Sequence, residues 1–258
     1  MSTVTAPENA GATPHELPTL GVVLVAAGRG ERLGANMPKA FVELDGRTLI
    51  EHCLDSVCAL PHSGHLVIVV PDSHAAEALA IVEATDHRDS GWEISVVPGG
   101  RERDESVRFG LAVVPDHVDV VLIHDAARPL TPTAQFELVS SAVHRLGESV
   151  IPVLAVADTI KRIDASGVVH ETVDRSSLVS VQTPQGFPRE LITAAHETLR
   201  RATDGATPPT DDAEVVQRAG GSVHTVPGDA LAHKLTTQED RMLLEALLAA
   251  NSREERDR

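Results

Sequence analysis

Aromatic residues and a basic surface are what this sequence most lacks. Phe, Trp and Tyr make up 2% of its 258 residues and Tyr is absent, so recognition of a base would rely on backbone groups and small polar side chains rather than on stacking. The formal net charge is −16, which argues against a protein that binds nucleic acid or anionic membranes. A local group of cations can still bind an anionic small molecule, because exposed charges beyond about 8–10 Å are largely screened at physiological salt.

Long apolar runs and clustered metal ligands are lacking too. No run approaches the roughly 18 residues of a membrane span. Residues 1–18 have neither the basic start nor the apolar core of a secretory signal, and we expect them to be a disordered leader. Cys53 and Cys58 are the only cysteines, and we expect two buried thiols in a reducing cytoplasm. The thirteen histidines show no spacing typical of a zinc site.

Apolar, β-branched runs instead alternate with segments that carry apolar residues at helical spacing. The predicted strands span 20–27, 65–70, 93–98, 119–127, 150–157 and 222–227, and the predicted helices span 48–60, 73–85, 105–114, 133–146, 188–202 and 237–250. This alternation predicts an α/β fold, with a Rossmann-like, mostly parallel sheet and helices on both faces. We expect a single domain over residues 19–250, followed by a frayed helical tail at 251–258.

Two segments break the alternation. Residues 159–175 read as two short strands around Ala165-Ser166-Gly167, which predicts a projecting β-hairpin arm. From the segment alone, a surface hairpin of no functional consequence is the more common case. Residues 203–214 are rich in Pro, Thr and Asp and predict a loop.

The loop after the first predicted strand is the natural place for a ligand, because sites in parallel sheets lie beyond the carboxyl ends of the strands. Gly28 and Gly30 allow the backbone to approach a ligand closely. A dinucleotide-binding loop would need its third glycine at position 33, where Leu33 stands. A P-loop would need Lys followed by Ser or Thr, and this is also missing.

Three cations of this loop favour a different anionic ligand. Arg29, Arg32 and Lys39 are spaced so that they can converge on several phosphates of an extended triphosphate. Each of them alone would more simply be a solvated surface charge. Their occurrence together with two glycines, directly after an apolar strand, makes a phosphate site the better interpretation.

Eight motifs in order along the chain resemble one family. They are A-A-G-x-G-x-R-L followed by P-K (26–39), GGRERDESV (99–107), HDAARP (124–129), DTIKR (158–162), TVDR (172–175), TPQGF (183–187), TDDA (210–213) and AHKLTT (232–237). In combination they resemble the 2-C-methyl-D-erythritol 4-phosphate cytidylyltransferases of the non-mevalonate isoprenoid pathway, over about residues 20–250. Ala40 and His233 depart from the family, in which Gln and Asn are usual at these positions.

The resemblance implies a reaction of CTP with a polyol phosphate that gives a CDP-alcohol and pyrophosphate. The attacking phosphate is already ionised near pH 7, since its second pKa is about 6, so no general base is required. Catalysis would then depend on positioning and charge stabilisation. Three alternatives stay open: a cytidylyltransferase for a pentitol phosphate such as ribitol 5-phosphate, a nicotinamide-dependent dehydrogenase, and a non-catalytic nucleotide-binding regulator.

The same resemblance assigns roles to individual residues. It implies Arg32, Lys39 and Lys234 as catalytic. The nucleotide would be bound by Ala26, Ala27, Gly28, Gly30, Gly100, Arg103, Ser106, Asp125 and Ala126. The polyol phosphate would be bound by Asp125, Arg128, Thr159, Arg175, Thr183, Thr210 and Lys234.

Several of these residues have a simpler structural interpretation. Asp125 ends a predicted strand, where a carboxylate suits Mg²⁺, although an Asp there often caps the next segment. Arg103 and Ser106 sit at a predicted helix start, which Asp104 or Ser106 could cap. Arg128 could hold the second substrate or brace the loop. The family is dimeric, and its arm supplies residues to the neighbouring subunit, so we expect a homodimer formed through the arm.

Overall fold

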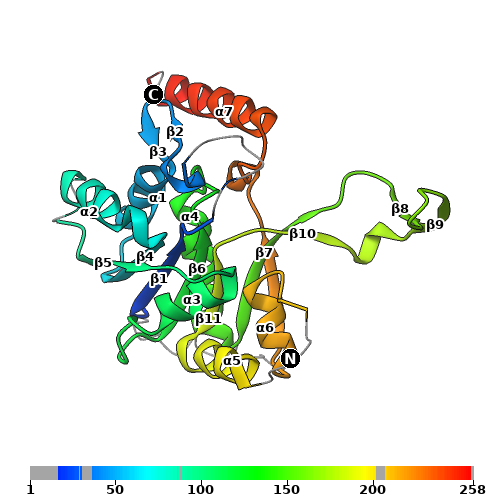
Figure 1. The fold of residues 1–258 in the computed structure, drawn as a ribbon, viewed down its shortest axis with the longest axis horizontal. Helices are drawn as coiled ribbons and strands as arrows, with labels where there is room; N and C mark the ends of the chain where they lie inside the picture. Colours follow the sequence, from blue (N-terminus) through cyan, green and yellow to red (C-terminus); the bar gives the residue numbers. More distant parts are fainter. Residues whose placement is uncertain are drawn as a thin grey trace, which may run out of the picture.

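The structure is a computed structural model and describes residues 17–28, 30, 37–85, 87, 89–201 and 207–256. Its centre is an eight-stranded sheet in the order β10-β7-β11-β6-β1-β4-β5, with β12 paired to β7 (Figure 1). The strands are β1 (Leu20–Val25), β4 (Gly64–Val70), β5 (Trp92–Pro98), β6 (Val120–Asp125), β7 (Ser149–Ala155), β10 (Val179–Val181), β11 (Gln185–Pro188) and β12 (Val223–Pro227).

The order of the strands reverses next to β1. From β1 the chain moves to β4 and β5 on one side, and it later returns to place β6 on the other side, in parallel register with Val25 opposite Asp125. Such a reversal leaves a crevice beyond the carboxyl ends of the two strands, which is where open α/β sheets bind ligands. The first loop and the end of β6 therefore meet at one edge of the sheet.

Helices cover both faces of this sheet because the buried strands are apolar on both sides. One face packs against α1 (Leu49–Cys58), α2 (Ala75–Ala84) and α4 (Thr133–Leu146). The other packs against α3 (Arg103–Leu111), α5 (Arg189–Arg201) and α6 (Asp212–Arg218). Along β1, alternate residues serve the two faces, with Leu20, Val22 and Leu24 on the first and Val23 on the second.

A third, smaller cluster attaches the last helix, α7 (Gln238–Arg256). Leu244 of α7 packs with Leu235 and with Leu44 of the short hairpin β2 (Glu43–Leu44) and β3 (Arg47–Thr48). Thr237 and Asp240 form the capping box predicted for this helix: the Asp240 N–H donates to Thr237 Oγ1 at 3.2 Å and the Thr237 N–H to Asp240 Oδ2 at 2.8 Å. Among the described helices, none has the length and apolar character needed to cross a membrane.

The predicted arm is confirmed as a separate two-stranded sheet of β8 (Ile160–Ile163) and β9 (Val169–Val173). It projects away from the body of the molecule (Figure 1). Its apolar side chains find little to pack against within the chain, as Ile163 and Val169 are 59% and 57% exposed. An isolated hairpin is only marginally stable in water, so we expect this arm to pack against another surface.

The predicted α/β architecture is confirmed, and three details differ from expectation. The predicted loop 203–214 was partly wrong, since its last residues begin the helix α6, which the Pro- and Asp-rich composition hid. Strands β10 and β11 were not anticipated, and both run antiparallel to their neighbours. Cys53 is buried but Cys58 is only partly so, and both are free thiols. Of the expected leader only Leu17 and Pro18 are described, and α7 continues to Arg256.

Candidate active site

A cleft of about 560 Å³ opens at the carboxyl ends of β1 and β6. Its walls come from four separate parts of the chain: the first loop, the start of α3, the end of β6 and the loop before α7. The residues that line it are Val25, Ala27, Gly28, Gly30, Lys39, Gly100, Arg101, Glu102, Arg103, Ser106, Asp125, Ala127, Lys234 and Thr236. Four cations and three glycines are among these residues, as expected for a site that binds a phosphorylated ligand.

Gly30 brings the two ends of the first loop together. Its φ of 69° lies in the left-handed region, and a Cβ at this position would stand 3.0 Å from Lys39 Cβ. The Lys39 N–H donates to the Gly28 carbonyl at 3.3 Å. These contacts hold the Lys39 backbone against the glycine end of the loop, so that the residue lines the cleft.

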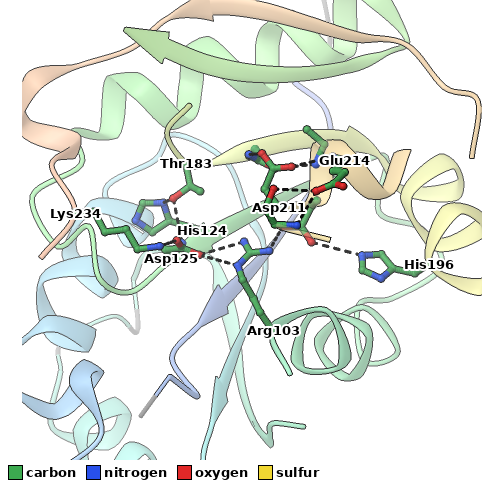
Figure 2. Close-up of polar contacts among 12 residues, drawn as sticks. Arg103, His124, Asp125, Thr183, His196, Asp211, Glu214 and Lys234 are labelled. Carbon is green, nitrogen blue, oxygen red and sulfur yellow. Dashed lines mark hydrogen bonds and ion pairs between the residues drawn. The ribbon is translucent and has the colours of Figure 1, made fainter. Parts of the chain in front are cut away.

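Asp125 is the buried carboxylate at the centre of the cleft, and Figure 2 shows it between two cations. Its Oδ1 accepts from Arg103 Nε at 3.2 Å and Nη2 at 3.1 Å, and its Oδ2 accepts from Lys234 Nζ at 2.7 Å. Burial alone would raise the pKa of this carboxyl, but Arg103 and Lys234 outweigh burial and hold the pKa well below its usual range. Asp125 is therefore ionised throughout the physiological range.

Arg103 is shared between two acids. Besides Asp125, its Nη1 lies 2.7 Å from Oδ2 of Asp212, which is fully buried in the first turn of α6. The buried His196 of α5 lies on the other side of Asp212, with Nε2 3.5 Å from Oδ1 (Figure 2). The guanidinium is thus fixed from two elements that are distant in sequence, and α6 is tied electrostatically to the cleft.

The loop that carries Lys234 is held from both ends. The Leu235 N–H donates to the Ala127 carbonyl at 2.8 Å, which attaches the loop to the turn after β6. At the other end Asp240 accepts from the N–H groups of Thr236 and Thr237, at 2.7 and 2.8 Å, and lies 2.7 Å from His233 Nε2. The family departure at His233 is accommodated here, because its ring pairs with the helix-capping carboxylate.

We predict an acid-sensitive contribution of Asp240 to stability. Burial would raise its pKa, but the hydrogen bonds from Thr236, His233 and Thr237 outweigh it, so the folded-state pKa is lowered. A lowered pKa stabilises the fold above the unfolded value of about 3.9 and the stabilisation is lost as the pH falls through the folded pKa. Asp240→Asn removes a negative charge from the first turn of α7 and one acceptor oxygen, so it should cost about 0.5–2 kcal/mol at pH 7.

Urea unfolding of wild type and Asp240→Asn between pH 7 and pH 2 measures this contribution. The difference between the two proteins should shrink progressively below about pH 4. Glu190→Gln is a matched control, because Glu190 is an exposed acid in the first turn of another helix, α5, outside the Lys234 loop and the start of α7. A difference that stays constant down to pH 2 would contradict the assignment.

The cleft brings together nine of the residues predicted from sequence: Ala27, Gly28, Gly30, Lys39, Gly100, Arg103, Ser106, Asp125 and Lys234. Ala26 and Ala126 are buried beside it. Arg32 lies outside the described residues, and its catalytic role stays a prediction.

Other predicted residues do not line the cleft of their own chain. Thr159 and Arg175 are exposed on and beside the arm, where Arg175 donates to the Ala157 carbonyl. Thr210 donates through its hydroxyl to Glu214 at 2.9 Å, within the start of α6. Their roles in acceptor binding remain predictions that depend on a second subunit or on movement of these segments.

The structure bears on two interpretations that the sequence left open, one for Arg128 and one for the start of α3. Arg128 braces the structure: its Nη1 donates to the Ala232 carbonyl at 2.6 Å and its Nη2 to the Val181 carbonyl at 3.3 Å. The expected helix cap by Asp104 or Ser106 is wrong, because the N-cap of α3 is Glu102.

The Ser106 hydroxyl supports the neighbouring loop instead of capping the helix. It accepts from the Gly100 N–H and donates to the Glu102 carbonyl, each at 3.0 Å. Ser106 is 2% exposed, so its main observed function is to hold Gly100 at the wall of the cleft. A direct contact with the nucleotide stays a prediction.

Some residues of the site could not be identified from the sequence. Arg101, Glu102 and Thr236 line the cleft, and the motifs around them offered no reason to choose them over their neighbours. Asp212 was included in the TDDA motif, but an Asp at a helix start is usually a cap. Only its burial and its pairing with Arg103 distinguish it.

The donor set of the cleft suits magnesium better than a transition metal. Within the described part of the chain, no three His, Cys, Asp or Glu residues are grouped closely enough to form a metal cage. Mg²⁺ is usually bound by one or two carboxylates together with phosphate oxygens and water. The ionised Asp125 carboxylate could supply such a ligand. Mg²⁺ would then either share one carboxylate oxygen with Arg103 or Lys234, or replace one of these cations at that oxygen.

Comparison with known proteins supports these observations. The family model of 2-C-methyl-D-erythritol 4-phosphate cytidylyltransferase (IspD) matches residues 20–250. The chain is 43% identical over 223 residues to the protein of that name from Nocardia farcinica, covering 86% of this chain and 91% of the relative. It is 50% identical over 235 residues to a bifunctional IspD/IspF enzyme of Clavibacter michiganensis, covering 91% of this chain but only 56% of that longer protein.

Solved structures of proteins with this activity have a fold similar to that of this chain. The 4-diphosphocytidyl-2C-methyl-D-erythritol synthase of Anaerococcus prevotii superposes with a TM-score of 0.77 at 28% identity, covering 90% of this chain and 96% of that one. The 2-C-methyl-D-erythritol 4-phosphate cytidylyltransferase of Thermus thermophilus superposes with a TM-score of 0.68 at 31% identity, covering 88% and 98%. The similarity thus extends over nearly the whole of both structures.

Proposed function

Because the chain belongs to the 2-C-methyl-D-erythritol 4-phosphate cytidylyltransferase family, we propose that the cleft beyond β1 and β6 is where it transfers a cytidylyl group from CTP to 2-C-methyl-D-erythritol 4-phosphate. The products are 4-diphosphocytidyl-2-C-methyl-D-erythritol and pyrophosphate, as in the synthesis of isoprenoid precursors. The enzyme is thus a CTP-dependent nucleotidyltransferase.

The observation that carries the assignment to this cleft is the meeting of distant cations around one carboxylate. Lys39, Arg103 and Lys234 come from three separate segments and line the same cleft, and two of them contact Asp125. Such a group of positive charges can draw two anionic substrates together, which is the main obstacle in this reaction.

The side chains then have complementary roles. Lys39 neutralises the negative charge that develops on the α-phosphoryl group and on the leaving pyrophosphate. Lys234 holds the acceptor phosphate, while Asp125 fixes the positions of Lys234 and Arg103 by ion pairing. The acceptor phosphate attacks as an anion, so the site needs no residue that removes a proton.

Asp125 is also the residue that would hold Mg²⁺. When bound, the ion supplies charge neutralisation to the phosphates of CTP. The fully ionised state of Asp125 and its place at the carboxyl end of β6 support this role.

The pentitol phosphate alternative shares the nucleotide-binding half of the site, and no observation favours it. A pyrophosphate-release assay with CTP and Mg²⁺, run with 2-C-methyl-D-erythritol 4-phosphate and with ribitol 5-phosphate, tests the proposal. We expect release only with the first acceptor. Release only with ribitol 5-phosphate would overturn the acceptor assignment, and CTP binding without any release would favour a regulator.

We further propose a homodimer in which each arm completes the site of the other subunit. The exposed apolar residues Ile163 and Val169 give the arm a surface suited to burial. Thr159 and Arg175 do not line the cleft of their own chain, and a partner's cleft would give both a role. The free thiols of Cys53 and Cys58 support the companion proposal of a reducing, cytoplasmic location.

Mixing two inactive variants tests the shared site. Lys39→Ala removes a cleft residue and Arg175→Ala removes an arm residue, so each homodimer should be inactive. Random reassociation of equal amounts makes half of the dimers heterodimers, each with one intact site, so co-refolding should restore about a quarter of the wild-type pyrophosphate release. Two Lys39→Ala preparations refolded together are the control, and absence of recovery in the mixed sample counts against a shared site.

A further inference from the structure

His124 is a fully buried histidine that lies beside the proposed site without lining the cleft. It precedes Asp125 in β6 and is 0% exposed, with its ring 4.9 Å from the ring of Phe136. Both ring nitrogens have partners: Nδ1 lies 3.0 Å from Thr183 Oγ1, and Nε2 lies 3.2 Å from the Arg128 carbonyl oxygen. Figure 2 shows the first of these contacts and its continuation to Asp125.

The partners determine the direction of each hydrogen bond. A carbonyl oxygen can only accept, so Nε2 carries a hydrogen and donates to Arg128. With the hydrogen on Nε2, the neutral imidazole has a lone pair on Nδ1, which faces the Thr183 hydroxyl. The Thr183 hydroxyl therefore donates to Nδ1. Its oxygen in turn accepts from the Asp125 N–H at 3.1 Å.

These bonds fix both ends of the turn that presents Asp125 to the cleft. The Thr183 branch holds the backbone at Asp125, and the Nε2 branch holds the carbonyl of Arg128, three residues further on. We propose that His124 and Thr183 are positioning residues for Asp125, acting as one directed hydrogen-bond relay. The inference rests on the proposed function, since the importance of Asp125 is derived from it.

This assignment differs from the role implied for Thr183 by resemblance, which is a direct contact with the polyol phosphate. The Thr183 hydroxyl donates to His124 and accepts from Asp125, and the residue is 4% exposed. A purely structural role for His124, packing on Phe136, would require no polar partner at Nδ1. The two explanations predict different kinetics.

Steady-state kinetics of Thr183→Val, Thr183→Ser and His124→Gln distinguish them. Thr183→Val deletes the hydroxyl at nearly constant volume, and His124→Gln keeps a donor near the Nε2 position but deprives Thr183 of its acceptor. Thr183→Val and His124→Gln should each lower kcat by about 10- to 100-fold, because Asp125 is displaced. The KM for CTP and the KM for the acceptor should change less, because no substrate contact is lost. Thr183→Ser should retain most of the activity.

The double variant shows whether the residues act as one unit. His124→Gln combined with Thr183→Val should be no slower than the slower single variant, whereas independent effects would multiply. His65→Gln is the control: His65 is half-buried near the amino end of β4, at the opposite end of the sheet from the cleft, and its Nε2 lies 3.0 Å from Ser95 Oγ. It should leave kcat unchanged.

A spectroscopic readout keeps the test independent of activity. Imidazole ¹⁵N spectra of the full-length protein, with the His124 signals assigned from their loss in His124→Gln, should show a neutral ring protonated at Nε2. In Thr183→Val the Nδ1 resonance should shift as its hydrogen bond is lost. If wild type releases no pyrophosphate, the proposed function fails while the spectra still report the relay.

Two results would overturn the relay itself. The first is a Thr183→Val enzyme with normal kcat and a raised KM for the acceptor alone, which would indicate a substrate contact. The second is a ring protonated at Nδ1, which would reverse the hydrogen bond to Thr183.

Discussion

Replacing Lys39 with alanine is expected to lower kcat/KM for CTP by about 10²–10³, or about 2.7–4 kcal/mol of transition-state stabilisation. The reason is that Lys39 lines the cleft, in which we propose that charge develops on the transferred and departing phosphates. Pyrophosphate release measures the effect. Thermal unfolding should be close to wild type, because Lys39 contributes its charge to the cleft rather than apolar surface to the core.

Two further substitutions separate charge from packing. Lys39→Met retains most of the aliphatic stem and should be as inactive as Lys39→Ala, whereas Lys39→Arg keeps the charge and should lose less. Arg145→Ala removes an exposed cation in the last turn of α4 and is the control for a general change in charge. A purified Lys39→Ala enzyme with nearly wild-type kinetics would refute the catalytic role.

We expect the second large effect from Asp125→Asn, which should lower both the activity and the stability of the protein. The substitution removes the carboxylate that holds Arg103 and Lys234, so both cations lose the geometry that positions substrate, and we expect a loss of at least about 10² in kcat. The fold should also lose stability, by less than the roughly 3–5 kcal/mol typical of a fully buried pair, because the Lys234 and Arg103 side chains are 41% and 28% exposed. Pyrophosphate release and urea unfolding measure the two losses separately.

Asp45→Asn is the matched control for Asp125→Asn. Asp45 is exposed in the turn between β2 and β3, and its φ of 52° lies in the left-handed region, which asparagine adopts as readily as aspartate. This variant should therefore be nearly as stable and active as wild type. An Asp125→Asn enzyme that keeps both its activity and its stability would exclude Asp125 as the organising residue of the cleft.

Much of the fold could be predicted because its sheet is buried on both faces. Apolar runs such as those of β1 and β6 have no other suitable environment, and α4 begins and ends at the residues that its apolar spacing predicts. Strand β11 escaped prediction because it is short, begins after Thr183-Pro184 and owes its conformation to pairing with β6. Here tertiary contacts determine the structure, and local sequence carries little signal.

Some residues of the site could likewise be predicted from the sequence, and others could not. Lys39 and Lys234 stand in motifs whose residue types suit phosphate chemistry, and the ends of parallel strands explain why such motifs converge. The pairing of Arg103 with Asp212, and the relay through His124, depend on which distant segments touch. Their residue types are ordinary for a helix start and a strand, so nothing local distinguishes them.

The way in which the arm leaves the sheet has an evolutionary consequence. Strands β7 and β10 pair antiparallel with Ala155 opposite Val179, so the segment 156–178 departs and returns through neighbouring positions. It is in effect an elongated hairpin loop, which a turn of about two to five residues could replace without opening the sheet. Lineages could therefore remodel or shorten the arm while the rest of the sheet, with the cleft at its edge, stays unchanged.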